Sequence, residues 1–283
     1  MITVFGSTGR IGGAAAVELR RRGLEVRAVV RDLARGETLA RSGCQLAAAD
    51  LRKRSDVERA LDNASGALVI CPLSPTVPDV EAAAERVIDA LSGAIETVRP
   101  ARVVVISDYG ADQPAGTGIT MIFHRLETSL RAAPTSITFV RSAEHMQNWK
   151  RYASAARARG VLPSLHPLTK KFPTVSAPDV GVVAADLLSG PGGTPRVLHV
   201  EGPRRYTVLE VAKVLERIVG RPVEARELPR ADWMDALLAA GLSESYARLV
   251  AELQDAHNIG RIDAEAGGEI RRGPTELADA LTR

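Results

Sequence analysis

The residues VFGSTGRIGG at positions 4–13 constrain the fold more than any other part of the sequence. A short apolar run meets a turn with Gly6, Gly9 and Gly12, and a pattern of helical period follows at once. Gly6 permits a tight turn, and Gly12 lets a helix pack closely on a strand. The stretch therefore predicts a strand, a turn and a helix that begins at the turn.

Apolar runs alternate with amphipathic segments over the first 140 residues. The runs cover 2–5, 25–30, 44–50, 66–72, 101–107 and 135–141, and the amphipathic segments cover 11–22, 54–63, 79–92 and 118–132. Near-continuous Val and Ile runs are typical of strands that are buried on both faces. The alternation predicts an α/β fold, a doubly wound parallel sheet of the Rossmann type with right-handed crossovers and helices on both faces.

The rhythm changes after residue 141. Segments 172–177 and 196–202 have the pattern of sheet or sheet-edge pieces. Helices are predicted at 177–189, 207–219, 230–240 and 243–258, a strand at 222–229, and a short helix that starts at Pro274. We therefore expect two parts: a Rossmann domain at 1–150, and a smaller, mainly helical lobe at 151–283. The lobe should add sheet-completing segments and form one wall of a cleft.

Charge and cysteine content narrow the class of protein. The chain has 37 basic and 34 acidic residues, a net charge of +3, and its arginine clusters, such as 20–22, are typical of helix ends rather than of nucleic-acid contacts. Cys44 and Cys71 lie too far apart to indicate a disulfide framework or a metal site. No apolar stretch has the length of a membrane span, and no signal peptide is evident. We expect a cytoplasmic protein without metal, membrane or nucleic-acid partners.

The position of the glycine turn predicts its ligand. Glycines at this spacing, after the first strand of a strand–helix series, are typical of dinucleotide-binding loops, and Gly9 would let the backbone approach a pyrophosphate. The phosphates would lie on free N–H groups at the positive end of the helix dipole. The alternative is a plain glycine-rich turn. The loop residues assigned to the cofactor are Gly6, Ser7, Thr8, Gly9, Arg10, Ile11 and Gly12.

Arg31 ends the second predicted strand, where an NAD-preferring site usually carries an acidic residue for the ribose hydroxyl. Arg10 lies in the glycine loop, and Arg35 is close to Arg31 in the sequence. A guanidinium matches a 2′-phosphate bidentately, so we expect a preference for NADP(H) over NAD(H). In the alternative interpretation Arg31 merely ends the strand and pairs with Asp32.

Asp50 and Leu51 follow the third predicted strand, where the adenine of a bound dinucleotide would lie. We assign both residues to the cofactor. The alternative, in which Asp50 serves a turn or caps a helix, is nearly as strong.

Several stretches together resemble the NmrA-like branch of the atypical short-chain dehydrogenases/reductases. They are VFGSTGRIGG, VRAVVRD, AAADLRKRSDVERAL, SITFVRSAEHMQNW, VSAPDVGVVAADLL and the lobe segments HVEGPRRYTVLEVAKVLERIVGRPV and ADWMDALLAAGLSESYARLV. The lobe segments are the most specific, and they resemble quinone-reductase-like and ergot-alkaloid-reductase-like members. The resemblance implies a Rossmann domain that binds NADP(H), a substrate cleft under the lobe, and a cofactor contact from Pro72 and Leu73.

The same resemblance draws attention to candidates for proton transfer. The usual Tyr-x-x-x-Lys pair is absent, because Gln113 follows Tyr109 where the lysine should stand, although Ser107 occupies the place of the upstream serine. His124 lies near a position where relatives carry Lys or His, and it could bind the ribose or donate a proton. Alternatively His124 is a surface residue paired with Glu127. Ser107, Tyr109 and His124 are the predicted catalytic residues, and Ser107 is also assigned to the cofactor.

The segment after the sixth predicted strand should form the floor of the substrate cleft. Ser142, His145, Met146 and Trp149 are assigned to the substrate together with Tyr109. Ordinary packing of a loop into the lobe is the alternative, and it fits Trp149 best.

Hydride transfer to a quinone or a C=N bond needs little from the protein beyond orientation, and a solvent proton can complete it. We therefore expect an NADPH-dependent oxidoreductase that reduces a small quinone, enone or imine/iminium. The alternative is a non-catalytic NADP(H) sensor that contacts a partner protein. A homodimer is also considered, since the apolar face of 79–92 could be either core or interface.

Overall fold

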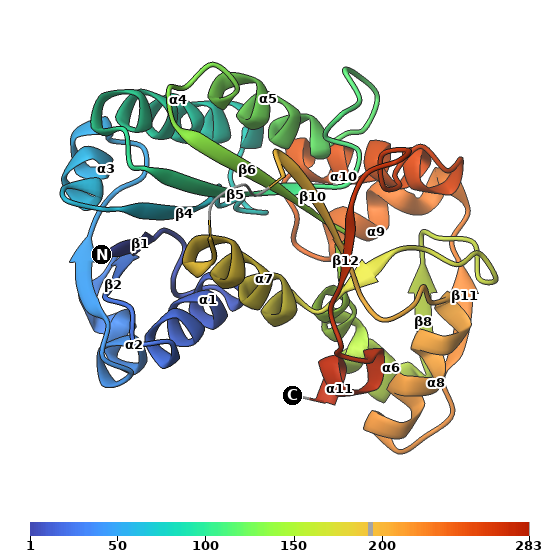
Figure 1. Cartoon of the computed structure of the whole chain (residues 1–283). Helices are drawn as coiled ribbons and strands as arrows, with labels where there is room; N and C mark the ends of the chain where they lie inside the picture. The colour runs from blue at the N-terminus through green and yellow to red at the C-terminus, as the bar shows by residue number, and fades with distance from the viewer. Residues whose placement is uncertain (192–194, 283) are drawn as a thin grey trace.

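A computed structural model describes residues 1–191 and 195–282, and its centre is an eight-stranded parallel sheet (Figure 1). From one edge to the other the strands are β12 (Ile270–Arg272), β10 (Val197–Glu201), β6 (Ser136–Ser142), β5 (Arg102–Asp108), β4 (Gly66–Ile70), β1 (Ile2–Val4), β2 (Val26–Val30) and β3 (Gln45–Ala48). Every pairing in this sheet is parallel. The predicted doubly wound Rossmann-type sheet is confirmed.

Helices cover both faces of the sheet. One face carries α1 (Arg10–Arg21) and α7 (Ala177–Ser189), and the other carries α3 (Arg54–Leu61), α4 (Val80–Val98) and α5 (Thr120–Leu130). The short helices η1 (Leu33–Gly36) and α2 (Glu37–Arg41) connect β2 to β3. A Cβ atom on Gly181 of α7 would overlap the carbonyl oxygen of Ile11, so this glycine allows α7 to lie directly on the backbone of α1.

The strand registers bring several chain segments to one edge of the sheet. Because all strands run the same way, the segments that follow β1, β4, β5 and β6 all leave at their carboxyl ends. Ser107 pairs with Arg141 and Asp108 with Ser142 across β5 and β6. Ligands of open parallel sheets bind at this edge, so it is where functional side chains are to be sought.

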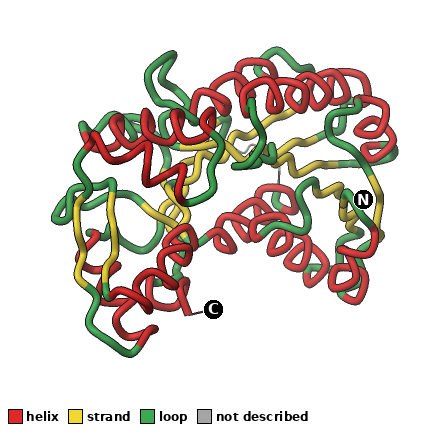
Figure 2. Tube along the Cα trace, turned by 180° about the vertical axis from the view of Figure 1, so that it is seen from behind, coloured by secondary structure: helices red, strands yellow, loops and turns green. Residues whose placement is uncertain are grey.

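The remaining segments form the lobe seen beside the sheet in Figures 1 and 2. Its elements are β7 (Glu144–His145), η2 (Met146–Tyr152), α6 (Ala153–Arg159), β8 (Val161–Ser164), β9 (Thr174–Val175), α8 (Val208–Val219), β11 (Glu224–Glu227), η3 (Arg230–Asp232), α9 (Trp233–Ala239), α10 (Glu244–Asn258) and α11 (Leu277–Thr282). One apolar cluster joins η2, α6, α8 and α11, and another joins α9 and α10. The lobe is mainly helical, as predicted.

Some element boundaries differ from the prediction. Segment 172–177 does not join the central sheet: only Thr174–Val175 is a strand, and it pairs with β7, while Pro173 beside it lacks the N–H that a longer ladder would need. The terminal helix begins at Leu277 rather than at Pro274. Helix α4 continues to Val98, beyond the predicted end at residue 92, because Ala94 and Ile95 extend its buried face.

The apolar face of α4 is part of the core. Val80, Ala84, Val87 and Leu91 are buried in the cluster that also contains residues of α3 and α5. Of the two interpretations of this face, core is therefore correct. Within the described residues, no helix is both long and apolar enough to cross a membrane.

Candidate functional site

The glycine turn between β1 and α1 has the geometry that its spacing predicts. Gly6 has φ of +66°, a conformation that side chains other than glycine rarely adopt. The Gly9 amide donates to the Gly6 carbonyl at 2.9 Å and closes the turn. A Cβ atom on Gly12 would overlap that same carbonyl oxygen, so α1 can approach the turn only with glycine at this position.

The N-terminus of α1 is open to an anion. No side chain caps the helix at Gly9, and its first turn contains no acidic residue. The buried Ser7 hydroxyl donates to the Val29 carbonyl at 2.7 Å, which ties the turn to β2. Thr8 and Arg10 are exposed and Ile11 is buried. Uncapped amides beside a backbone that has no Cβ in the way fit a pyrophosphate.

Three arginines lie near this turn in the fold, because Arg10 begins α1 and Arg31 and Arg35 follow β2, the strand paired with β1. Arg10, Arg31 and Arg35 are all exposed, and none of their side chains forms a hydrogen bond or an ion pair within the described residues. Asp32 instead accepts a hydrogen bond from the Ala34 amide at 3.0 Å and caps η1. The alternative pairing of Arg31 with Asp32 is therefore not formed, and the guanidinium is available to a ligand.

The Asp50 carboxylate is occupied by its neighbour Arg52. The guanidinium donates to both carboxylate oxygens, at 2.9 and 2.8 Å, and the Arg52 amide donates to one of them at 3.0 Å. These bonds lower the pKa of Asp50 to about 2. Asp50 thus serves the turn in this structure, as the alternative interpretation proposes. An adenine contact remains a prediction for Asp50 and for the half-buried Leu51.

The loop that follows β4 carries the other predicted cofactor contacts. Pro72 is exposed at its start, and the half-buried Leu73 packs against the apolar cluster between the sheet and α4. The loop leaves at the carboxyl edge of the sheet next to the glycine turn, because β4 pairs directly with β1. Its position agrees with a cofactor contact, which stays a prediction.

Ser107 belongs to a buried ionic network at the ends of β5 and β6. Its hydroxyl donates to Oε1 of Glu127 at 2.7 Å, and Arg141 donates to both oxygens of Glu127 at 2.8 Å. The side chains of Arg141 and Glu127 are each 1% exposed. Arg141 also donates to Glu265 at 2.9 Å. This network is not among the sites predicted from the sequence, although an arginine inside the apolar strand SITFVRS indicates that a buried counter-ion must exist.

Tyr109 is buried and donates its hydroxyl to Oε1 of Glu201 at 3.2 Å. Burial and the negative charge of Glu201 raise the pKa of Tyr109 strongly. Glu201 is itself 1% exposed and accepts hydrogen bonds from Arg205 and Arg272. The phenol proton is therefore engaged in a junction between β5, β10 and the segment around β12.

His124 lies on α5 with Nδ1 2.8 Å from the carbonyl oxygen of Ala111. Because a carbonyl only accepts, Nδ1 carries the proton, and Nε2 has no partner within the described residues. The predicted alternative, a pair with Glu127, is wrong: Glu127 points into the core and binds Ser107 and Arg141. The half-buried ring keeps one nitrogen free for a ligand.

The segment after β6 brings Ser142 and His145 together. The Ser142 hydroxyl lies 3.3 Å from Nε2 of His145. Burial lowers the pKa of His145 to about 4, the negative charge of Glu144 opposes this shift, and the positive charge of Arg10 adds to it. The ring is therefore neutral at neutral pH and lies within electrostatic reach of the glycine turn, which connects a predicted substrate residue with the cofactor loop.

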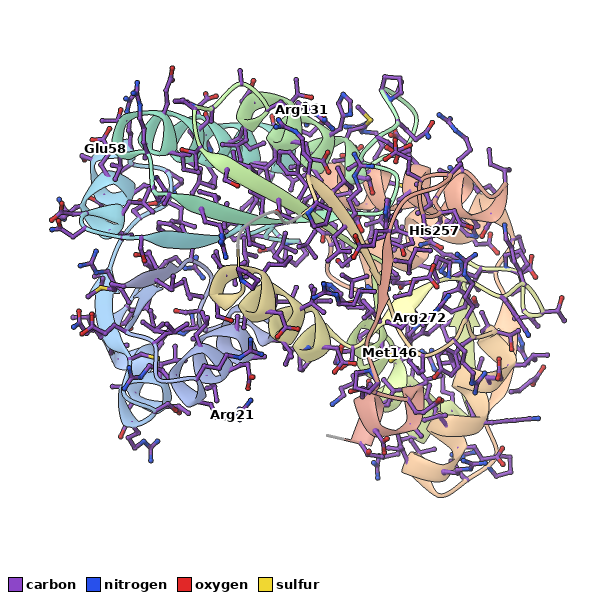
Figure 3. The ribbon with its side chains drawn as sticks, viewed as in Figure 1. Arg21, Glu58, Arg131, Met146, His257 and Arg272 are labelled. Atoms are coloured by element: carbon purple, nitrogen blue, oxygen red, sulfur yellow. The ribbon has the colours of Figure 1, made fainter. Side chains whose placement is uncertain are left out.

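Met146 and Trp149 lie deeper in the lobe, as Figure 3 shows for Met146. Met146 is fully buried in the lobe core, and Trp149 packs against Tyr152, His166 and Phe172. Trp149 also lines a cavity of about 20 Å³ together with Glu144, Arg151, Tyr152, Leu165, His166, Leu237, Val250 and Gln254. Met146 is therefore a packing residue in this structure, and Trp149 both packs in the lobe core and lines the cavity.

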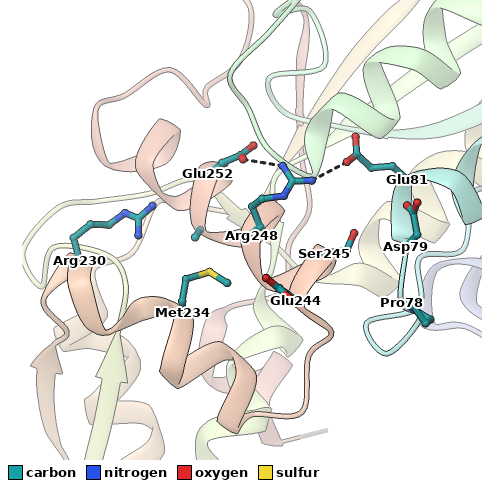
Figure 4. A pocket seen from close by; sticks show the side chains of 10 residues that line it. Pro78, Asp79, Glu81, Arg230, Met234, Glu244, Ser245, Arg248 and Glu252 are labelled. Carbon is teal, nitrogen blue, oxygen red and sulfur yellow. Dashed lines mark hydrogen bonds and ion pairs between the residues drawn. The ribbon is translucent and has the colours of Figure 1, made fainter.

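A larger open cavity, of about 630 Å³, lies between the start of α4 and helices α9 and α10 (Figure 4). Arg248 crosses it and donates to Glu81 at 2.9 Å and to Glu252 at 3.0 Å. None of the residues assigned to cofactor or substrate lines this cavity. The residues that the sequence assigns to cofactor and substrate therefore lie outside this groove.

Comparison with known proteins adds to this geometry. A model of the NmrA-like family matches residues 1–278. The chain is 30% identical over 254 residues to the NAD(P)H azoreductase of Xenophilus azovorans, which covers 89% of this chain and 86% of that protein. It is 31% identical over 232 residues to the (4-alkanoyl-5-oxo-2,5-dihydrofuran-3-yl)methyl phosphate reductase of Streptomyces griseus, with 81% and 77% covered.

Solved structures agree on the fold. The NADPH complex of the NADPH-dependent quinone oxidoreductase of Escherichia coli superposes with a TM-score of 0.82 at 22% identity. The superposition covers 100% of this chain and 99% of that one. At this identity the likeness concerns the arrangement of the elements, and it extends through both the sheet and the lobe.

Proposed function

The chain belongs to the NmrA-like family, and from this membership we propose that it is an NADPH-dependent reductase that transfers a hydride to a small quinone, enone or imine. The coarser statement, an NAD(P)H-dependent oxidoreductase, follows from the family and from the related azoreductase. The observation that carries the proposal is the open, uncapped N-terminus of α1 at the glycine turn, with three unpaired arginines beside it.

The residues present fit a dinucleotide. The α1 amides hold the pyrophosphate, and the absence of a Cβ on Gly12 lets α1 begin directly against the Gly6 carbonyl, next to the turn. Arg31 binds the 2′-phosphate of NADPH, because its guanidinium is exposed and has no carboxylate partner. We further propose that residues 1–150 carry the cofactor and that the part of residues 151–283 outside the central sheet and α7, which forms the lobe, covers the reacting end.

A bound reduced nicotinamide would supply the hydride. The chain itself supplies orientation and a dry environment at the carboxyl ends of β4, β5 and β6. We assign Ser142 and His145 to the acceptor, and the free Nε2 of His124 to a hydrogen bond from a ribose hydroxyl. Ser107 and Tyr109 each donate to a buried glutamate, so they hold the site in shape.

The absence of a Tyr-x-x-x-Lys pair favours acceptors other than ketones. Ketone reduction relies on such a pair, whereas quinones, enones and imines accept a hydride more readily. The names of the two related enzymes, an azoreductase and a reductase of an alkanoyl-oxo-dihydrofuran, support unsaturated acceptors for this chain as well.

The direct test is a titration of the purified protein with NADPH and NADH by nicotinamide fluorescence, followed by a panel of quinones, enones, imines and azo compounds. We expect NADPH to bind at least tenfold more tightly than NADH, and its absorbance to decay with one acceptor class. Tight binding without turnover across the panel would favour the non-catalytic sensor. Failure of both nucleotides to bind would refute the assignment of the glycine turn.

A further inference from the structure

Asp108 is the last residue of β5, between the ends of β4 and β6, at the edge of the sheet where open parallel sheets bind their ligands. It is half-buried. It follows Ser107 and pairs in register with Ser142, two residues that border the proposed site. The backbone therefore places this carboxyl group beside the reacting end of the proposed cofactor site.

Asp108 lacks a cationic partner. The buried carboxylates of Glu127 and Glu201 are each paired with two arginines, whereas no Lys, Arg or His forms an ion pair with Asp108 within the described residues. Oδ2 of Asp108 accepts a hydrogen bond from the Thr120 hydroxyl at 2.9 Å. A partly buried carboxyl group without a counter-ion is poorly suited to carry a charge.

The charged and titratable neighbours of Asp108 reinforce this property. Glu144 faces it from the segment after β6, and Tyr246 faces it from α10. Burial raises the pKa of Asp108 to about 7, the Thr120 hydroxyl and the Tyr109 amide oppose this rise, and the negative charge of Glu144 adds to it. A substantial share of Asp108 is therefore protonated near neutral pH.

We propose that Asp108 is the proton donor of the reduction, in place of the missing Tyr-x-x-x-Lys pair. The role rests on the proposed function, since it needs an acceptor that has taken up a hydride at this edge of the sheet. Among the titratable groups at the strand ends, Ser107 and Tyr109 already donate to glutamates and His145 is held neutral. Asp108, by contrast, accepts a hydrogen bond from Thr120 and has no cationic partner within the described residues that would hold it as a carboxylate.

The proposed reduction transfers one hydride and one proton to the acceptor. An acceptor that takes up one hydride gains one hydrogen and an electron pair, and its oxygen, nitrogen or carbon conjugate becomes anionic. The O–H bond of the Asp108 carboxyl breaks, and a new bond from that proton to the acceptor anion forms. Solvent returns a proton to the carboxylate before the next turnover, so each cycle consumes one acceptor, one NADPH and one proton.

The protonation of Asp108 can be measured without cofactor. Infrared difference spectra between the wild type and Asp108→Asn should show a protonated carboxyl band that disappears with a midpoint near pH 7. Asp89→Asn, at an exposed position on α4, is the matched control, and its difference spectrum should lack the band because Asp108 is present in both proteins. Ionisation of Asp108 throughout pH 5–8 would overturn the proposal whatever the activity.

The pH profile of the reduction gives the second readout, with the acceptor that the wild type reduces fastest. We expect kcat to fall as pH rises through about 7, and Asp108→Asn to lose roughly 100-fold at pH 6 with NADPH affinity unchanged. Thr120→Val removes a bond that lowers the pKa of Asp108, so the falling limb should move to higher pH. Glu144→Gln removes a charge that raises it, so the limb should move to lower pH.

The outcomes separate the two proposals. If the wild type reduces an acceptor and Asp108→Asn reduces it at the same rate, the donor role alone is overturned. A falling limb that is lost in His124→Gln and kept in Asp108→Asn assigns the proton to His124 instead. Failure of the wild type to reduce any acceptor overturns the proposed function, and the donor role with it.

Discussion

The Ser107 hydroxyl lies 2.7 Å from Oε1 of Glu127, inside a network where Arg141 holds both oxygens of that carboxylate. The contact joins the end of β5 to α5 and, through Arg141, to β6. A serine at the position that short-chain reductases use for catalysis thus has a structural partner in this chain.

Loss of the charge on Glu127 should destabilise the fold. Glu127→Gln leaves the guanidinium of Arg141 buried without its main counter-ion, and we expect the free energy of unfolding to drop by about 3 kcal/mol. Urea denaturation measures this change. Glu58→Gln, which breaks the exposed pair with Arg54, is the control and should cost less than about 1 kcal/mol. Equal effects of the two variants would contradict a structural role for the buried network.

Substitution of Gly12 should damage the cofactor loop. In Gly12→Ala the new Cβ overlaps the Gly6 carbonyl, so the turn must move and overpacking costs about 1–3 kcal/mol. We expect NADPH affinity, measured by fluorescence titration, to weaken by at least about tenfold. Gly13→Ala is a matched control, since its Cβ would lie 3.2 Å from the Ser7 carbonyl and needs only a small adjustment. Similar affinities in both variants would refute the close approach at Gly12.

Arg31 should decide between the two nucleotides. Removal of a charged hydrogen bond costs about 1.5–3 kcal/mol, so Arg31→Ala should weaken NADPH binding by roughly 10- to 100-fold and leave NADH binding unchanged. Arg41→Ala, an exposed arginine on α2, should change neither affinity. Parallel titrations with both nucleotides measure the effect. An equal loss for NADPH and NADH would show that Arg31 does not contact the 2′-phosphate.

The phenol of Tyr109 should be dispensable for turnover. Tyr109→Phe removes one of several hydrogen bonds to Glu201, and we expect a loss of about 1 kcal/mol in stability with kcat within about twofold. Tyr206→Phe removes a similar bond to Glu276 in the lobe and serves as control. A fall in kcat of roughly 100-fold in Tyr109→Phe alone would identify Tyr109 as the proton donor.

The fold could be predicted from the sequence because most strands of the central sheet are short runs of apolar residues. The Val and Ile runs at 66–70 and 102–107 became β4 and β5, buried on both faces. Strand β12 was missed because its sequence, IRR, has no apolar run and is defined by its pairing with β10. Strand β9 was placed in the wrong sheet, since a short apolar segment does not specify its partner.

The candidate site likewise has a part that could be predicted from local sequence and a part that could not. The glycine turn depends on residues within one short stretch, so its geometry followed from spacing. The environments of Glu127 and Asp108 depend on residues far away in sequence, such as Arg141 for the first and Glu144 for the second. Whether a carboxyl group meets an arginine or another carboxylate decides its chemistry, and helical or strand periodicity does not contain that information.

The contact at Gly181 has a consequence for how the protein is made. Helix α1 emerges early from the ribosome, but the helix that covers it, α7, is translated only after six strands of the sheet. Until then the part of α1 around Ile11, Ala14 and Ala15, which lies against Gly181 in the folded protein, lacks this contact. Pairings between distant segments form slowly, so the nucleotide loop should mature late, and the nascent chain should depend on chaperones before residue 181 is available.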